Sequence, residues 1–395
     1  MTTRKICYIM PEYKAKTSKH YQHLLDFFDV LSRKAKLFVI AETGDPLEHE
    51  HSSYQYYLAK FRKKILSRIE IFLIILYLRI KGYKVFYSHY AYRTALIASF
   101  ITRILGGRTY LWHCMCVKKM HKESKASIEM QEKLKQTLNK IQYIVTGSNF
   151  VAKLYEDFGE FDLSKVVVVP NWISLNRFDP NKYSKEEIRK ELELPLNKKI
   201  VLFVHTLSSG KGAGYLPDIF HKMTLARDDL HFLVAGGLWD AEKDLTEYFK
   251  NGLDKYGLWD KVSWKGFVPN EVIQKYYLAA DLFIMPSKFE GFSRVLLESM
   301  AMGTPFVATT GGGSILEYTS TMQQEFIIPP EDIDRFHNLC LNLLYDENKQ
   351  KELSAHGLEW VKKYSIESVF PIFEERIMEG KHSFENPVFN DSSSS

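Results

Sequence analysis

Short apolar runs alternate with longer amphipathic segments along most of this chain, and this alternation limits the available folds more than any other feature. Apolar runs rich in β-branched and aromatic residues are typical of strands buried in a parallel sheet, and the segments between them are long enough for crossover helices. The pattern therefore predicts an α/β protein with doubly wound parallel sheets. The predicted strands cover residues 6–10, 37–41, 85–87, 109–112 and 144–146 in a first series, and residues 200–204, 232–235, 262–264, 282–285 and 306–308 in a second.

Two series of strands indicate two domains, which agrees with a length of 395 residues, too long for one ordinary core. A polar segment bounded by Pro170 and Pro180 separates the two series and is of the kind that joins domains. We therefore expect a first domain over residues 1–172, a second over residues 173–365, and a disordered, serine-ended tail over residues 386–395. Ligands of such sheets bind at the carboxyl ends of the strands, so we expect the site in a cleft between the domains. The helices predicted within the first series cover residues 21–34, 61–80, 93–105 and 127–141.

Charge is divided unequally between the two halves of the chain. Residues 1–170 carry a net charge of +13, and residues 171–395 carry −8. No recognised nucleic-acid-binding motif accompanies the basic half, so we expect no nucleic-acid partner. A basic cluster at residues 60–68 precedes an apolar run at residues 69–80 that is too short and too charged to span a bilayer. This segment is either a buried helix with a solvated basic start or an interfacial helix on an anionic membrane.

The first residues contain no long apolar region or cleavage site of a signal peptide. A composition of 45% apolar and 26% charged residues is typical of soluble globular proteins. We therefore expect a cytoplasmic protein, with peripheral attachment to the inner face of a membrane as the alternative that its basic half leaves open.

Two glutamates flank a predicted helix start that follows the strand at residues 282–285. Glu290 precedes a glycine turn, and Glu298 lies within the helix predicted over residues 294–302. A glycine turn that leads into a helix leaves backbone N–H groups available to a phosphate, and carboxylates accept hydrogen bonds from hydroxyls. The alternative is a surface helix whose glutamate merely complements the helix dipole.

A second unit of the same kind follows at once. A strand at residues 306–308 leads through the glycines of residues 311–313 toward another predicted helix. Two consecutive strand–glycine–helix units point two phosphate-binding helix N-termini in the same direction. This arrangement favours a nucleotide sugar as the ligand.

These segments resemble the group 1 glycosyltransferases, a family of retaining enzymes with the two-domain GT-B fold. The resemblance implies two Rossmann-like domains that face a cleft, with a C-terminal helix over about residues 366–385 that crosses back to the first domain. It also implies sugar transfer from a nucleotide-diphosphate sugar to a glycan or lipid-linked acceptor, as in the synthesis of cell-surface polysaccharides or glycolipids, without a metal or other cofactor. The matching segments, in the order and spacing of the family, are residues 166–173, 202–212, 232–237, 262–269 and 280–317.

The resemblance assigns roles to several residues of the second domain. Glu298 would bind the ribose hydroxyls of the donor, and Glu290 would bind hydroxyls of the donor sugar near the reacting carbon. Lys211 would stabilise the departing pyrophosphate, since fixed cationic donors in a dry site do this better than water. The remaining donor-binding candidates are the glycine turn and its N–H groups, together with the loop after the strand at residues 262–264: Gly291, Phe292, Ser293 and Gly266.

The chain departs from the family pattern at Thr206, where the resemblance implies an arginine. A threonine cannot supply a guanidinium fork. Stabilisation of the leaving group would then fall on Lys211, on the N–H groups of the turn, or on Arg294 as a substitute, although an arginine that opens a helix is often only solvated. The missing arginine also leaves open an epimerase of the same fold or an inactive nucleotide-sugar-binding subunit.

Candidates in the first domain are fewer. His113, at the end of the strand at residues 109–112, matches in position a family histidine that faces the donor sugar, and a structural hydrogen-bonding role is the alternative. The loop after the first strand lacks the paired glycines of many relatives. Lys16, Ser18 and His20 are the candidates there for contact with the acceptor.

Two other classes of site fit the sequence less well. Asp332 and Asp334 satisfy an Asp-x-Asp metal pattern, but they stand at a predicted helix start, where acidic residues cap the dipole. The glycines of residues 210–214 follow a strand, as in NAD(P)-dependent oxidoreductases, yet Tyr215 occupies a position where that fingerprint requires glycine. We therefore expect neither a metal nor a nicotinamide cofactor.

Overall fold

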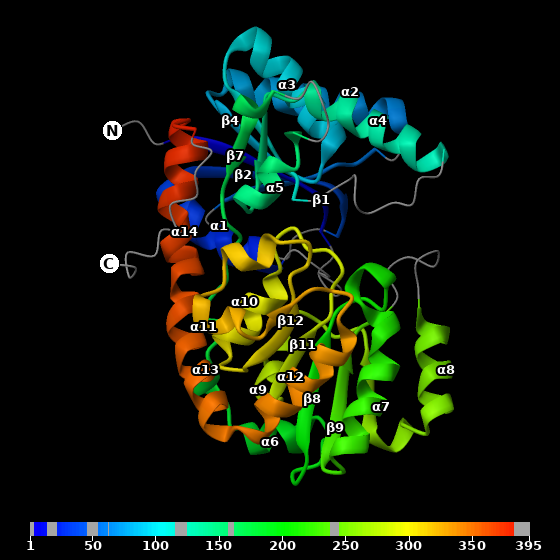
Figure 1. The fold of residues 1–395 in the computed structure, drawn as a ribbon. Coiled ribbons are helices and arrows are strands. Elements are labelled where there is room, and N and C mark those ends of the chain that lie inside the picture. The colour runs from blue at the N-terminus through cyan, green and yellow to red at the C-terminus, as the bar shows by residue number, and fades with distance from the viewer. Residues whose placement is uncertain are drawn as a thin grey trace. The chain divides into compact units, whose positions relative to one another are not determined.

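The chain forms two compact units, each built on one parallel sheet with helices on both faces (Figure 1). Unit 1 comprises Met1–Asn171 and Ile366–Ser395, and unit 2 comprises Trp172–Ser365. The prediction of two doubly wound α/β units is confirmed. The structure is a computed structural model that describes residues 4–13, 22–45, 54–61, 63–114, 125–156, 162–237 and 245–382.

The sheet of unit 1 has seven strands in the order β3-β2-β1-β4-β5-β6-β7, and every neighbouring pair is parallel. Because the chain builds outward from β1 in one direction and then from β4 in the other, the order reverses between these two strands. The strands are β1 (Lys5–Tyr13), β2 (Lys36–Gly44), β3 (Gln55–Leu58), β4 (Val85–His89), β5 (Arg108–Trp112), β6 (Tyr143–Thr146) and β7 (Val166–Val168). The helices are α1 (Gln22–Lys34), α2 (Lys64–Ile80), α3 (Tyr92–Leu105), α4 (Lys125–Asn139), α5 (Asn149–Lys153) and α14 (Ile366–Phe373).

Different helices cover the two faces of this sheet. On one face, apolar side chains of α2 and α3 pack with Cys7 and Ile9 of β1 and Phe86 of β4 in one buried cluster. On the other face, the ring of Phe27 in α1 lies 4.9 Å from that of Phe373 in α14, so the C-terminal helix belongs to the core of unit 1. The implied return of the last helix to the first unit is confirmed.

Pro371 lies inside this last helix and does not end it. α14 continues through Pro371 to Phe373, and a π-helical turn follows over Glu374–Glu379. Proline removes one backbone N–H donor and crowds the preceding turn. The irregularity lies three residues after the proline, where the helix widens.

The sheet of unit 2 has six parallel strands in the order β10-β9-β8-β11-β12-β13, and its order reverses between β8 and β11. The strands are β8 (Lys199–Val204), β9 (Leu230–Ala235), β10 (Val262–Gly266), β11 (Leu282–Met285), β12 (Phe306–Thr309) and β13 (Ile327–Ile328). The helices are α6 (Lys185–Glu191), α7 (Leu216–Ala226), α8 (Thr246–Tyr256), α9 (Ile273–Ala279), α10 (Arg294–Ala301), α11 (Thr321–Gln324), α12 (Ile333–Tyr345) and α13 (Glu347–Trp360).

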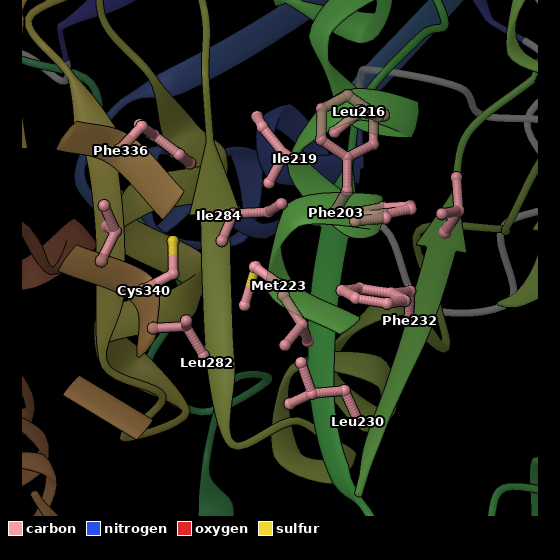
Figure 2. Close-up of a cluster of buried hydrophobic side chains, with 14 of the residues drawn as sticks. Phe203, Leu216, Ile219, Met223, Leu230, Phe232, Leu282, Ile284, Phe336 and Cys340 are labelled. Atoms are coloured by element: carbon pink, nitrogen blue, oxygen red, sulfur yellow. The ribbon is translucent and has the colours of Figure 1, made fainter. Parts of the chain in front are cut away.

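The core of unit 2 forms where α7 and α12 pack on the central strands (Figure 2). Ile219 and Met223 of α7 lie over β8 and β11, and Phe336 and Cys340 of α12 extend the same cluster. The side chain of Asp332 accepts a hydrogen bond from the N–H of Arg335 and caps α12, as its place at a predicted helix start implies. This core holds the carboxyl ends of β8, β11 and β12 in fixed register.

Candidate functional site

The candidate site of unit 2 lies where the order of the sheet reverses. β8 and β11 are neighbours, and the chain leaves them toward opposite edges of the sheet. Loops at the carboxyl ends of two such strands diverge and leave room for a ligand between them. Lys211 follows β8 and Glu290 follows β11, so the two principal candidates come from the two strands that define this point.

The loops after β8 and β11 approach each other closely. Gly212 has a φ of 72°, and a Cβ at this position would lie 1.9 Å from the carbonyl oxygen of Pro286. The N–H of Lys288 donates to the carbonyl of Gly210 at 2.9 Å. Only glycine fits this backbone contact, which brings the Lys211 segment beside the Glu290 segment.

The carboxylate of Glu290 is the centre of the site. Lys211 Nζ donates to Glu290 Oε1 at 2.9 Å, and His205 Nε2 lies 3.9 Å from the same oxygen. The backbone N–H of Glu290 donates to the carbonyl of Gly311 at 2.8 Å, and the Ser314 hydroxyl donates to the Glu290 carbonyl at 2.7 Å. The Glu290 side chain is only 6% exposed, so a buried carboxylate is held between two cationic or potentially cationic groups.

His205 is a site residue that the sequence reasoning missed. It follows β8 directly, and its Nδ1 accepts a hydrogen bond from the N–H of Thr206 at 2.9 Å. This bond places the proton of a neutral imidazole on Nε2, the nitrogen that faces Glu290. A histidine at the carboxyl end of a strand, one residue before the position where an arginine was expected, was the available signal.

Thr206 itself contributes no charge to the site. Its hydroxyl lies 3.3 Å from His205 Nδ1 and 3.5 Å from the hydroxyl of Ser208. The threonine that replaces the expected arginine therefore orients the neighbouring imidazole.

Glu298 lies in α10, in surroundings different from those of Glu290. The hydroxyl of Tyr277 donates to Glu298 Oε2 at 3.0 Å. Burial raises the pKa of the Glu298 carboxyl, although the charges of Arg294 and Arg177 and the Tyr277 hydroxyl oppose the shift. Glu290 is thus paired with a lysine, whereas Glu298 lies beside a tyrosine and two arginines. Two carboxylates in such different surroundings suit hydrogen bonds to different parts of a ligand.

The turn between Glu290 and α10 is buried. The ring of Phe292 stacks on that of Tyr318 with centroids 4.2 Å apart, and the Ser293 N–H donates to the Tyr318 hydroxyl at 2.9 Å. Of the two N–H groups expected to bind a phosphate, that of Ser293 is therefore already hydrogen-bonded within the protein. Gly291 opens this turn, and Arg294 is the first residue of α10.

The second glycine loop, after β12, leads into a short 3-10 turn, Ser314–Glu317. The sequence predicts a helix at this point, and the one that forms is a single 3-10 turn and not an α-helix. Gly311 has a φ of 53°, and a Cβ there would lie 3.0 Å from the Cβ of Glu290. Gly311 of this loop packs against Glu290, and the Ser314 hydroxyl donates to the Glu290 carbonyl. The loop therefore supports the Glu290 carboxylate.

Gly266 lies at the end of β10, an edge strand separated from β8 by β9. The structure brings together Lys211 and Glu290, places Thr206 next to His205, and places Gly266 at the carboxyl end of a strand farther along the sheet. The three candidates for acceptor contact, Lys16, Ser18 and His20, lie outside the described residues.

His113 belongs to unit 1, where it follows β5. Its side chain is fully buried, its Nδ1 pairs with the hydroxyl of Tyr155, and that hydroxyl also donates to the His113 carbonyl at 2.9 Å. Burial lowers the pKa of His113 to about 4, so the ring is neutral at physiological pH. Its Nε2 is buried without a hydrogen-bond partner among the residues that the structure describes. A neutral imidazole whose Nδ1–H is donated to Tyr155 presents Nε2 as an acceptor for a hydroxyl donor.

Over the described part of the chain, His, Cys, Asp and Glu side chains form no group of three that could hold a metal ion.

Solved structures of glycosyltransferases share the fold of this chain. Sucrose-phosphate synthase from Thermosynechococcus elongatus superposes with a TM-score of 0.76 at 18% sequence identity, over 96% of this chain and 99% of that one. Anabaena Alr3699/HepE, solved in complex with UDP and glucose, gives a TM-score of 0.77 at 16% identity, over 95% of this chain and 100% of that one. The protein therefore has the GT-B fold.

Sequence comparison finds relatives of unit 2. Residues 184–360 match the model of the glycosyl transferases group 1. The putative teichuronic acid biosynthesis glycosyltransferase TuaC of Bacillus subtilis is 28% identical over 233 residues, which cover 54% of this chain and 56% of that protein. The lipopolysaccharide core biosynthesis mannosyltransferase LpsB of Rhizobium meliloti is 30% identical over 205 residues, 50% of this chain and 58% of that protein. The chain thus spans little more than half the length of these curated relatives. The resemblance drawn from the sequence is confirmed over residues 184–360, which match the family model.

Proposed function

We propose that this protein is a retaining glycosyltransferase that moves a sugar from a nucleotide-diphosphate sugar to a glycan or lipid-linked acceptor, without a metal cofactor. The observation that carries the proposal is the buried Glu290 carboxylate, paired with Lys211 at the point where the order of the unit 2 sheet reverses. A cation and a hydrogen-bond acceptor side by side suit a ligand that joins a phosphate to a sugar.

The proposed division of roles follows the contacts of each residue. Lys211 Nζ would donate to the diphosphate, while Glu290 Oε2, the oxygen not paired with Lys211, would accept from a hydroxyl of the sugar. Glu298 would accept from the ribose hydroxyls, and Arg294 beside it would add positive charge near the phosphates. In the transfer step, the bond between the anomeric carbon and the phosphate oxygen breaks, the acceptor oxygen bonds to that carbon on the same face, and its proton passes to the leaving phosphate.

His205 would compensate in part for the arginine that Thr206 replaces. Its Nε2–H is oriented toward the pair of Glu290 and Lys211 and could donate to an oxygen bound there. Two donors, the Lys211 ammonium and the His205 imidazole N–H, would then stand where the family pattern has an arginine and a lysine.

The proposed acceptor class rests on the named relatives. The relatives TuaC and LpsB are named for the biosynthesis of teichuronic acid and of the lipopolysaccharide core, and these names support a role in polysaccharide or glycolipid synthesis. We include a cytoplasmic location with peripheral attachment to the inner face of a membrane, because such acceptors are assembled on lipids. Among the described residues, no helix is both long and apolar enough to cross a bilayer.

Thr206 favours one alternative, a protein that binds nucleotide sugars without transferring them. A mass-spectrometric screen of UDP-, GDP- and ADP-sugars for transfer or hydrolysis tests both. We expect turnover of at least one donor and its loss in Glu290→Gln, while titration calorimetry still detects donor binding to the variant. Binding without turnover by the unsubstituted protein would favour the alternative, and NADH binding without nucleotide-sugar binding would contradict both.

A further inference from the structure

Helix α2 of unit 1 exposes a continuous apolar stripe to solvent. Six large apolar side chains of this helix are between 43% and 73% exposed, which is unusual for so many neighbours on one helix. Five of them recur at intervals of three and four residues and therefore lie on one face of the helix. The six residues are Ile65, Leu66, Ile69, Leu73, Tyr77 and Ile80.

The stripe is not part of the core of unit 1. The opposite side of α2 supplies Ile71, Ile75 and Leu78, which are at most 3% exposed and pack with β1 and β4. A helix needs only one apolar face to be held in a globular unit. The second apolar face of α2 therefore requires another explanation.

Helix α3 extends the same surface. It packs beside α2 in one buried cluster, and Arg79 of α2 donates to the carbonyl of Gly106 at the end of α3. Phe100 and Ile104, one helical turn apart on α3, are 57% and 65% exposed. We call the exposed apolar residues of these two helices the α2–α3 face.

The segment that contains both helices of the α2–α3 face is strongly basic. Residues 59–108 contain eleven Lys and Arg and a single acidic residue, Glu70. Glu70 is buried, and its carboxylate accepts hydrogen bonds from the hydroxyl of Tyr57 and from the N–H groups of Lys60 and Phe61. Burial alone would raise the pKa of Glu70, but these hydrogen bonds lower it overall, so the carboxylate stays ionised and directed inward. Lysine and arginine are the charged side chains that this surface exposes, among them Lys60, Lys63, Arg68, Lys81 and Arg103.

We propose that the α2–α3 face binds the surface of an anionic lipid bilayer, with its apolar side chains among the acyl chains and the basic residues at the phosphate groups. A surface that combines exposed apolar side chains with basic ones is the arrangement that interfacial binding requires. A second copy of the chain is a poor occupant, because a symmetric contact would bring the same positive charges together. The inference gives the peripheral location proposed above a specific surface, and it holds whether or not the protein transfers a sugar.

Vesicle flotation of the whole protein tests this proposal without any donor or acceptor. The vesicles contain phosphatidylcholine alone or phosphatidylcholine with phosphatidylglycerol, at low and at high salt. We expect binding to the anionic vesicles that weakens with salt. The triple variant Ile69→Ser/Leu73→Ser/Phe100→Ser should bind more than about tenfold more weakly, since each substitution removes an apolar side chain from the acyl region. Leu225→Ser, which alters a side chain that is 75% exposed on unit 2, is the matched control and should bind like the unsubstituted protein.

The basic residues are tested separately. Substitution of Lys63, Arg68 and Arg103 by glutamine should weaken binding at low salt by about fivefold for each charge removed. Circular dichroism verifies that each variant is folded, and Leu66→Ser/Tyr77→Ser replaces the apolar variant if it is not. Absence of binding to anionic vesicles, or equal binding by the apolar variant, would overturn the proposal. So would a dimer of the unsubstituted protein in sedimentation that the apolar variant dissociates while neither binds vesicles.

Discussion

The two units of this protein have the same sheet design but place their charges in opposite ways. In both sheets the strand order reverses once, between β1 and β4 in unit 1 and between β8 and β11 in unit 2. Unit 2 concentrates charge at that point, with a buried carboxylate between a lysine and a histidine. Unit 1 has a neutral, buried histidine at the carboxyl end of β5 and carries its charge on the outer side of its helices. One architecture can therefore serve a polar ligand in one unit and an extended surface in the other.

The largest effect should come from the charge in the site of unit 2. Lys211→Ala removes the cation paired with Glu290, and we expect kcat/KM for sugar transfer to fall by about 10²- to 10³-fold, the usual cost of one lost transition-state donor. A donor-release assay measures this. Lys222→Ala is the control, because Lys222 pairs with Asp334 on the surface of the same unit. Turnover in Lys211→Ala equal to that of the control would remove Lys211 from the mechanism.

The next largest effect should arise where the loops of unit 2 meet. Gly212→Ala places a Cβ 1.9 Å from the Pro286 carbonyl oxygen at a positive φ, and we expect a loss of roughly 3 kcal/mol in the free energy of unfolding. Gly257→Ala is matched to it, because Gly257 also has a positive φ, 61°, but no atom near its added Cβ. It should cost about 1 kcal/mol. Urea unfolding of both variants checks the difference, and equal losses would mean that backbone strain alone explains the glycine.

In unit 1, the buried carboxylate of α2 provides a comparable test. Glu70→Ala leaves the N–H groups of Lys60 and Phe61 and the hydroxyl of Tyr57 without their acceptor, at a cost of about 2–3 kcal/mol. Glu132→Ala, on an exposed carboxylate of α4, should change the free energy of unfolding by less than about 0.5 kcal/mol. If chemical denaturation finds the two variants equally stable, the inward anchoring of Glu70 is incorrect.

The smallest effect is a pH dependence that separates the two histidines. The pKa of His113 is lowered from its ordinary 6.5 to about 4, so the unfolded chain takes up a proton before the folded chain does. Stability should therefore decrease as the pH falls from 6.5 toward 4, and this histidine should account for about 2 kcal/mol of the loss at pH 5. His113→Gln should reduce the slope of stability against pH in this window, and His205→Gln is the comparison. Measuring the free energy of unfolding at a series of pH values tests this prediction. An unchanged dependence of stability on pH in His113→Gln would contradict the burial of His113 as a neutral ring.

Sequence patterns predicted most strands but missed the short ones. The missed strands β3, β7 and β13 all lie at the edges of their sheets, and β3 reads Gln-Tyr-Tyr-Leu without a clear apolar run, whereas β7 is apolar but only three residues long. β13 has only two residues and forms because β12 is already in place to pair with it. Edge strands depend on their neighbour more than on local propensity, so a local pattern contains little information about them.

Single site residues could be predicted where the residue type alone suggests its chemistry. Their roles could not be predicted where these depend on a tertiary contact. The pairing of Lys211 with Glu290 joins loops 79 positions apart in the chain, and no spacing indicates it. The participation of His205 depends on a hydrogen bond from Thr206 that sets its tautomer. The use of the Ser293 N–H by Tyr318 is likewise a tertiary contact, which single-sequence reasoning about free helix N–H groups cannot anticipate.

The return of the last helix to unit 1 has a consequence for how the protein is made. Phe370 and Phe373 complete the aromatic packing on Phe27, but they are synthesised only after all of Trp172–Ser365. During translation, unit 2 therefore has its whole sequence available before unit 1 does, although unit 1 begins first. The order of synthesis is the reverse of the order in which the two hydrophobic cores can close, and the nascent first unit must wait on the ribosome with one face of its sheet incompletely covered.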